Sequence, residues 1–195
     1  MDKGITFSAV LLAGGESRRM GRDKATMKFE GEPLWRRQMQ LLRALEPQKL
    51  FVSARTKPEW LPDDAALLVD DPPSRGPISG LTKALTAMRT THLIALAVDM
   101  PFMTVDELGR SLEFVTENRD FVPLIGKRAE PLAAIYPALA ADDFKAALGG
   151  EDFSLQRLVV NLMVDQKVAV RPVPAEAVDF YRSVNAPRDW PEFDA

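Results

Sequence analysis

The sequence predicts an α/β protein in which a mostly parallel, twisted sheet is covered by helices on both faces, giving three layers. Short apolar runs that suit buried strands alternate along the chain with segments whose apolar residues repeat at helical spacing. The length of 195 residues suits one domain with a sizeable core better than two small domains. We therefore expect residues 1–195 to form a single domain.

The alternation is clearest in the first half of the chain. The expected strands are Phe7 to Leu12, Lys49 to Ser53, Ala66 to Val69 and His92 to Val98. The last of these is the most apolar, so we expect a central parallel strand that is buried on both faces. Pro33 and Pro77 each suit the first position of a helix, and the residues that follow them keep helical spacing.

The second half of the chain departs from this alternation once. Thr104 and Glu107 have the spacing of a capping box, which predicts a helix that reaches about Val115. Two strand-like runs with a glycine-containing turn between them then predict a hairpin-like pair. The runs are Phe121 to Ile125 and Leu132 to Tyr136. The remaining expected elements are helices over Ala138 to Leu148 and Ser154 to Met163, and a last strand over Lys167 to Val173.

The composition excludes several kinds of function. The absence of cysteine excludes disulfides, thiolate metal sites and a cysteine nucleophile. A net charge of −3 argues against a nucleic-acid partner. The chain shows no apolar run of membrane-spanning length and no signal-peptide pattern, so we expect a cytoplasmic protein without a membrane partner. His92 is the single histidine, and its place before an apolar run favours a surface or strand-edge role over catalysis.

The stretch Leu11 to Lys24, LLAGGESRRMGRDK, carries the clearest chemical signal. The adjacent residues Gly14 and Gly15 let backbone N–H groups approach a ligand closely, and amides turned into a concavity bind anions. The cations Arg18, Arg19 and Lys24 add countercharge. The spacing fits neither the P-loop nor the dinucleotide-binding fingerprint. We predict a phosphate-binding loop of another kind, with a tight turn carrying solvated arginines as the alternative.

Two later positions also point to an anionic ligand. Gly76 precedes the predicted helix at Pro77, where free N–H groups and the helix dipole favour an anion. Asp99 follows the strand His92 to Val98, and ligands of open α/β sheets gather at the carboxyl ends of strands. From chemistry alone, Asp99 is either a metal ligand or a turn aspartate, and the Gly76 segment is either a ligand site or an ordinary strand-to-helix connection.

The segment LAGGESRRMGRDK resembles the signature L-A-G-G-x-S-x-R-M-G-x-D-K of the molybdenum cofactor guanylyltransferases. These are MobA-like nucleotidyltransferases, whose single domain is Rossmann-like. Three further segments are similar to family motifs: DDPPSRGPISG, DMPF and RAEPLAAIY. In the tail, Asn185, Pro187 and Asp189 match the family pattern, whereas Ser183 and Ala186 stand where asparagine and threonine are usual. Ser53 is another departure, because asparagine often occupies the aligned position.

The resemblance implies that GMP is transferred from GTP to molybdopterin carrying molybdenum, with release of pyrophosphate and with Mg²⁺ as cofactor. The product would pass to molybdoenzymes or their chaperones. The implied nucleotide-binding residues are Leu12, Ala13, Gly14, Gly15, Lys24, Ser53, Asp71 and Asp99, with Asp70 as the other possible alignment for Asp71. The implied catalytic residues are Arg19, Lys24 and Asp99. Asp99 would hold the metal ion and Asn185 would face the pterin.

Three alternatives remain at this point. The first is a related nucleotidyltransferase that uses CTP or a sugar phosphate. Members that use CTP tend to carry A-A-G where this chain has Leu12-Ala13-Gly14, which favours GTP. The second is a non-catalytic nucleotide-binding module, and the third is a purely structural or interaction protein. The presence of both Lys24 and Asp99 favours an enzyme, because a mere binder needs no metal ligand beside the α-phosphate.

Overall fold

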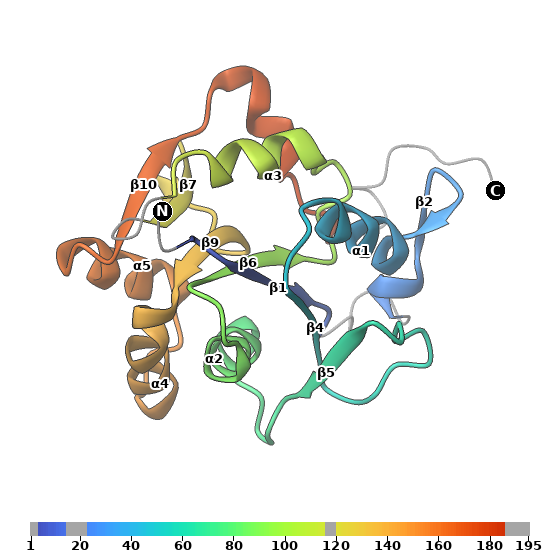
Figure 1. Cartoon of the computed structure of the whole chain (residues 1–195), viewed down its shortest axis with the longest axis horizontal. Helices are drawn as coiled ribbons and strands as arrows, with labels where there is room; N and C mark the ends of the chain where they lie inside the picture. The colour runs from blue at the N-terminus through green and yellow to red at the C-terminus, as the bar shows by residue number, and fades with distance from the viewer. Residues whose placement is uncertain (1–3, 15–22, 116–119, 186–195) are drawn as a thin grey trace.

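The structure is a computed structural model that describes residues 4–14, 23–115 and 120–185. Its centre is a five-stranded sheet in the order β5-β4-β1-β6-β9. The strands are β1 (Phe7–Leu12), β4 (Lys49–Ala54), β5 (Ala65–Val69), β6 (His92–Ala97) and β9 (Ala133–Pro137). The first four run parallel to one another, and β9 pairs with β6 in the antiparallel direction. Figure 1 shows the twisted sheet crossing the molecule between two layers of helices.

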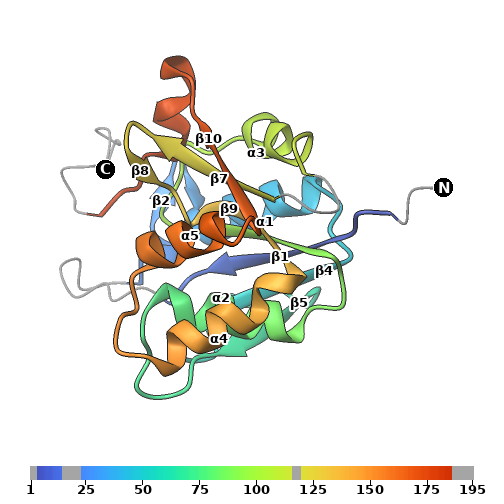
Figure 2. The same cartoon turned by 90° about the vertical axis from the view of Figure 1, so that its left-hand side faces the viewer.

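The strands alternate between two cores, one on each face of the sheet. Ala9 and Leu11 of β1 point to the core under α1 (Leu34–Ala44) and α3 (Val105–Leu112). Val10 and Leu12 point to the opposite core, which is covered by α2 (Pro77–Ala87), α4 (Ala141–Gly149) and α5 (Leu155–Val164). The predicted three-layer α/β architecture is therefore confirmed, and the two views in Figures 1 and 2 show both helical layers.

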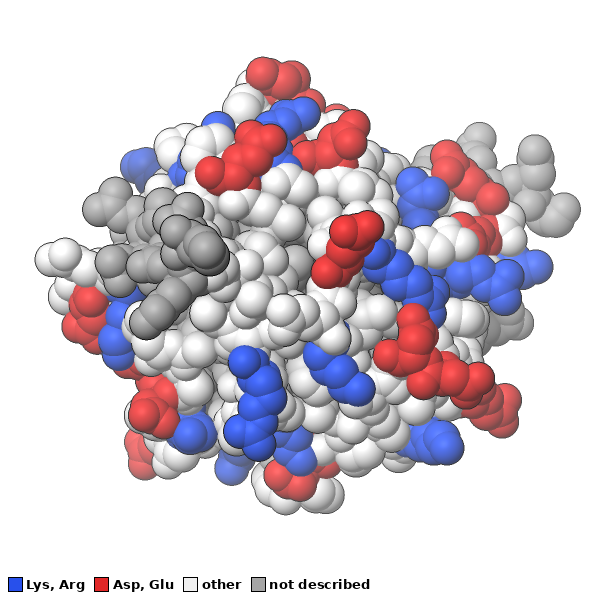
Figure 3. Space-filling view, viewed as in Figure 1, with Lys and Arg blue, Asp and Glu red and all other residues white. Residues whose placement is uncertain are grey.

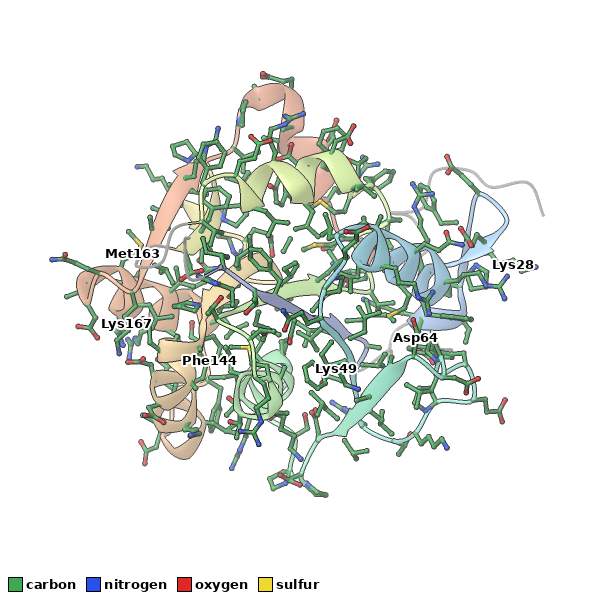
Figure 4. All side chains as sticks on the ribbon, viewed as in Figure 1. Lys28, Lys49, Asp64, Phe144, Met163 and Lys167 are labelled. Carbon is green, nitrogen blue, oxygen red and sulfur yellow. The ribbon has the colours of Figure 1, made fainter. Side chains whose placement is uncertain are left out.

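Large aromatic side chains fill the core on the α4 side. The ring of Phe144, labelled in Figure 4, meets the ring of Tyr136 edge to face at a centroid distance of 5.0 Å. Both side chains are fully buried, and the Tyr136 hydroxyl donates to the carbonyl of Pro131 at 2.8 Å. The buried phenol is thus paired, as a polar group in a core must be.

The predicted hairpin-like pair is wrong, because its two strands belong to different sheets. β7 (Asp120–Ile125) lies between β10 (Val168–Pro172) and the short β8 (Arg128–Ala129) in a three-stranded sheet. Gly126, at φ 60°, allows the tight turn that returns the chain from β7 to β8. The chain then leaves this sheet, and β9 joins the main sheet beside β6.

The short elements complete the chain and connect these layers. They are η1 (Lys24–Thr26), β2 (Lys28–Phe29), β3 (Glu32–Pro33), η2 (Ala138–Ala140) and η3 (Ala175–Tyr181). β2 and β3 form a separate two-stranded ladder.

The helix starts follow local sequence closely. Pro77 is the first residue of α2 and follows Gly76, whose φ of 77° suits glycine. Pro33 instead precedes α1 as its N-cap, one position earlier than predicted. Thr104 caps α3, since its hydroxyl accepts a hydrogen bond from the N–H of Glu107 at 3.2 Å. The Glu107 carboxylate accepts from Tyr181 at 2.9 Å.

His92 is buried, with 3% of its surface exposed, so the expected surface position is wrong. It does stand at the start of β6. Its Nε2 lies 3.0 Å from Oδ1 of Asp120 in β7, and its Nδ1 lies 2.7 Å from the Thr91 hydroxyl. Burial raises the pKa of the Asp120 carboxyl, and the contact with His92 opposes that rise. His92 therefore links the two sheets, at the end of β6 opposite Asp99.

Positive and negative side chains are interspersed on the face shown in Figure 3, without a broad area of one sign. Within the part of the chain that the structure describes, every helix is too short or too polar to cross a lipid bilayer.

Candidate active site

A cavity of about 330 Å³ opens where the carboxyl ends of β1, β4 and β6 meet the start of α2. This is the edge at which open α/β sheets bind their ligands. Six of the predicted site residues line it: Leu12, Ala13, Gly14, Lys24, Ser53 and Asp99. Gly15 and Arg19 lie outside the described residues, so their predicted roles stay predictions.

Neighbouring strands fix the backbone at the end of β1. The N–H of Ala13 donates to the carbonyl of Ser53 at 2.8 Å, and the carbonyl of Leu12 accepts from the N–H of Val98 at 3.1 Å. A Cβ on Gly14 would lie 3.7 Å from Asp70 Oδ2. The chain therefore enters the cavity at Gly14, directly from the middle strand of the sheet.

Three predicted residues that are far apart in sequence meet at one ammonium group. Lys24 Nζ donates to Asp99 Oδ2 at 3.1 Å and to Asn185 Oδ1 at 2.8 Å. The N–H of Val184 donates to the carbonyl of Asp99 at 2.8 Å, which brings the C-terminal segment to the end of β6. The side chains of Lys24 and Asp99 are 14% and 20% exposed, so solvent weakens their attraction less than at an open surface.

The carboxylate of Asp99 fits a Mg²⁺ ion. Mg²⁺ is commonly bound through one or two carboxylates together with substrate phosphates, and it keeps several of its waters. Among the described residues, no three histidine, cysteine or carboxylate side chains gather closely enough to hold a metal ion. Asp99 is therefore the residue that would hold such an ion, in the manner in which Mg²⁺ is bound through one or two carboxylates.

The structure brings Asp70, and not Asp71, to the cavity. Asp71 is 88% exposed at its side chain and pairs with Lys83 at 2.9 Å. Asp70 is 7% exposed and lines the cavity. Its Oδ2 accepts from the Ser74 hydroxyl at 2.7 Å, and Ser74 Oγ accepts from the N–H of Gly76 at 3.2 Å. Asp70 therefore organises the turn that leads into α2.

One atom of Asp70 also lacks a protein partner. Its Oδ1 is buried and makes no hydrogen bond to any of the described residues. A buried carboxylate oxygen without a donor is costly, so a ligand donor or a water at this end of the cavity would stabilise the site.

Arg55 is a site residue that the sequence reasoning missed. It follows β4, lines the cavity and donates from Nε to the carbonyl of Gly14 at 3.1 Å. Its position just beyond a strand's carboxyl end was the available signal. A cation at this position can contact a base or a phosphate while it steadies the Gly14 backbone.

Glu130 places a second carboxyl near Asp99. Burial raises the pKa of Glu130, and the negative charge of Asp99 raises it further, whereas a backbone hydrogen bond at Leu132 and the charge of Arg128 lower it. Leu132 lines the cavity, so this segment forms the side that faces β9.

A mostly parallel α/β sheet with a cavity at its carboxyl edge, lined by a lysine and a carboxylate, is typical of α/β proteins that bind a ligand at that edge. The family model described as the MobA-like NTP transferase domain matches residues 9–165. The chain belongs to this family and is a nucleotidyltransferase.

Curated relatives agree with this assignment, and a solved structure shares the fold. The chain is 32% identical over 186 residues to a protein of Opitutus terrae named "Probable molybdenum cofactor guanylyltransferase", covering 94% of this chain and 92% of the relative. It is 34% identical over 138 residues to the "Molybdenum cofactor guanylyltransferase" of Pseudomonas fluorescens, covering 68% of each chain. Its fold matches that of "Molybdopterin-guanine dinucleotide biosynthesis protein A" from Archaeoglobus fulgidus with a TM-score of 0.71, at 21% identity and with 93% and 94% of the two chains covered.

Proposed function

We propose that this protein transfers GMP from GTP to molybdenum-molybdopterin and releases pyrophosphate. The observation that carries the proposal is the convergence of Lys24, Asp99 and Asn185 at the cavity. The names of the relatives support the choice of acceptor. The product would then pass to molybdoenzymes or their chaperones.

The chemistry needs positioning and charge neutralisation more than proton transfer. The acceptor is a phosphate monoester that is already ionised at neutral pH, so it attacks the α-phosphorus of GTP without a side-chain general base. Phosphoryl-group transfer of this kind depends on in-line placement and on countercharge. This requirement suits a chain without cysteine whose single histidine is buried at the opposite end of β6.

The proposed role of each site residue follows from its position around the cavity. Backbone amides from Leu12 to Gly14 would hold the nucleotide beside the end of β1. Lys24 would neutralise the phosphates and stabilise the pyrophosphate as it leaves. Asp99 would hold Mg²⁺, which supplies positive charge to the phosphate oxygens when it is bound. Asn185, which shares the ammonium of Lys24, would stand on the acceptor side.

The nucleoside would lie toward Ser53, Arg55 and Asp70. We propose Asp70 in place of Asp71 as the acidic residue of this part of the site, because Asp70 lines the cavity and Asp71 faces solvent. The pair provides its own matched test. Asp70→Asn should weaken GTP binding, whereas Asp71→Asn should leave it within about twofold of the wild type.

The function is tested by single-turnover transfer from GTP, CTP and ATP with Mg²⁺ and molybdenum-loaded molybdopterin, read as pyrophosphate release. GTP should be preferred, and GTP should also raise the melting temperature more than CTP at equal concentration. Equal turnover of GTP and CTP would remove the guanine assignment and support the cytidylyl alternative.

Two variants test whether the protein is more than a nucleotide binder. Asp99→Asn removes the charge proposed to hold the metal ion, and Lys24→Ala removes the countercharge. Each should slow transfer by about 100-fold or more, which corresponds to about 3 kcal/mol of barrier. Lys83→Ala is the matched control, since Lys83 pairs with Asp71 outside the cavity. Near-wild-type transfer in folded Asp99→Asn and Lys24→Ala would remove both catalytic roles.

A further inference from the structure

We propose that Trp60 is a positioning residue that holds Lys24 in place through Asp23. The inference rests on the role proposed for Lys24 and adds a determinant from a different part of the chain. Trp60 lies in the segment between β4 and β5 and is not among the residues that line the cavity.

Asp23 connects Trp60 to Lys24. Its Oδ2 accepts from the indole N–H of Trp60 at 3.2 Å, and its Oδ1 accepts from the N–H of Ala25 at 3.0 Å. The second contact caps η1, whose first residue is Lys24. The Asp23 carbonyl also accepts from the N–H of Thr26 at 3.1 Å. Asp23 thus sets the backbone at the root of the Lys24 side chain, and Trp60 holds the carboxylate that does so.

Trp60 is itself held rigidly. Its ring stacks on that of Trp35 in the first turn of α1, with centroids 5.3 Å apart and the planes 12° from parallel. Four residues after Trp60, Asp64 forms a two-point contact with Arg43 of the same helix, at 2.8 and 2.7 Å; Figure 4 labels Asp64. The segment is therefore anchored to α1 at two places, and its indole N–H is a fixed donor.

A fixed indole donor is important because the Lys24 ammonium group has to be in position when negative charge develops on the phosphates during the reaction. Displacing a catalytic group by about 1 Å can lower a rate by as much as 100-fold. Without the indole N–H, the exposed Asp23 carboxylate can rotate while it keeps only its bond to Ala25. The backbone of η1 then has more conformational freedom, and the Lys24 ammonium group is in contact with Asp99 and with the phosphates for a smaller fraction of the time. Because water replaces part of the lost hydrogen bond, we expect an effect of about threefold to tenfold.

Two substitutions separate the hydrogen bond from the packing of the rings. Trp60→Phe keeps an aromatic ring on Trp35 but removes the donor to Asp23. Trp35→Phe disturbs the same stack and leaves that donor in place. Both variants should lose similar thermal stability. Trp60→Phe should lower kcat by about threefold to tenfold with a smaller change in KM, and Trp35→Phe should stay within about twofold of the wild type.

A double-mutant cycle tests whether the effect passes through Lys24. In the Lys24→Ala background, Trp60→Phe should cost less than about twofold, because the group that it positions is gone. The same cycle is read without turnover from the Kd of a GTP analogue with an α,β-methylene bridge, measured by calorimetry. Because Lys24 is also proposed to contact the phosphates of the bound nucleotide, Trp60→Phe should raise this Kd by less than it lowers kcat, and the rise should disappear in the Lys24→Ala background. A rate loss that is equal in both backgrounds, or equal for Trp60→Phe and Trp35→Phe, would overturn the inference and leave Trp60 as a packing residue.

The wild type separates this inference from the proposed function. If it transferred a nucleotide other than GMP, the proposed function would fail and the cycle would be read with that nucleotide. If it bound nucleoside triphosphates without transferring them, the binding cycle alone would decide for or against Trp60. If it bound none, both proposals would fall.

Discussion

Replacing Gly80 by alanine tests how closely α2 packs on the end of β4 at the cavity. A Cβ on Gly80 would lie 2.9 Å from the Cβ of Ser53 and 3.1 Å from Leu12 Cδ2, and it would approach the Ser53 hydroxyl more closely still. Carbon atoms in good contact stand about 3.5–4.0 Å apart, so the helix or the strand has to move. Overpacking of a buried site costs about 1–3 kcal/mol.

The matched control is Gly109→Ala in α3. A Cβ there would lie at an ordinary distance of 3.7 Å from Leu45 Cδ2, with no closer atom among the described residues. Both substitutions gain about 1 kcal/mol of helix propensity, and this gain cancels when the two variants are compared. Gly80→Ala should therefore be less stable than Gly109→Ala by about 1–3 kcal/mol.

Urea unfolding with equal m-values measures this difference in the free energy of unfolding. Adding Ser53→Ala should recover part of the loss from Gly80→Ala, because it removes the nearest atom, so the two changes should not be additive. A Gly80→Ala protein as stable as the Gly109→Ala protein would refute close packing of α2 on β4.

Two other predictions concern the partly buried carboxyl group of Glu130 and the buried one of Glu107. Burial raises the pKa of Glu130. The contribution of this carboxyl group to the free energy of unfolding is therefore full below its unfolded pKa and is lost as the pH rises through its folded pKa. Glu130→Gln should raise the free energy of unfolding at pH 7 and not at about pH 4; equal effects at the two pH values would contradict this account. Tyr181→Phe removes the 2.9 Å hydrogen bond to buried Glu107; it should cost about 1–3 kcal/mol in urea unfolding, and a neutral result would show that Glu107 finds another donor.

Local sequence patterns were sufficient for most elements, because caps and short apolar runs act over a few residues. Thr104 and Pro77 mark helix starts that the structure confirms. The strand partners of β7 and β9 were not accessible in this way, since the choice between two sheets depends on partners far away in the chain. The burial of His92 likewise depends on Asp120, which lies on another strand.

The residues of the candidate site likewise differ in whether a local sequence pattern or a contact between distant residues identifies them. Lys24 and Asp99 stood out because each follows a recognisable pattern, and the structure brings them within 3.1 Å. The choice between Asp70 and Asp71 needed the direction of each side chain beyond β5. There the exposed Val69 is followed by buried Asp70 and exposed Asp71. Trp60 carried no sequence signal, because the role proposed for it rests only on its contact with Asp23.

The contact between Lys24 and Asn185 spans 161 positions, which sets an order of events during synthesis. The early part of a chain leaves the ribosome first and begins to fold first. Lys24 and Asp99 therefore leave the ribosome well before Asn185 does. Asn185 also lies beyond the matched family segment, residues 9–165. With Asn185 assigned to the acceptor side, the residues proposed to hold the nucleotide are all made before the residue proposed to face the acceptor.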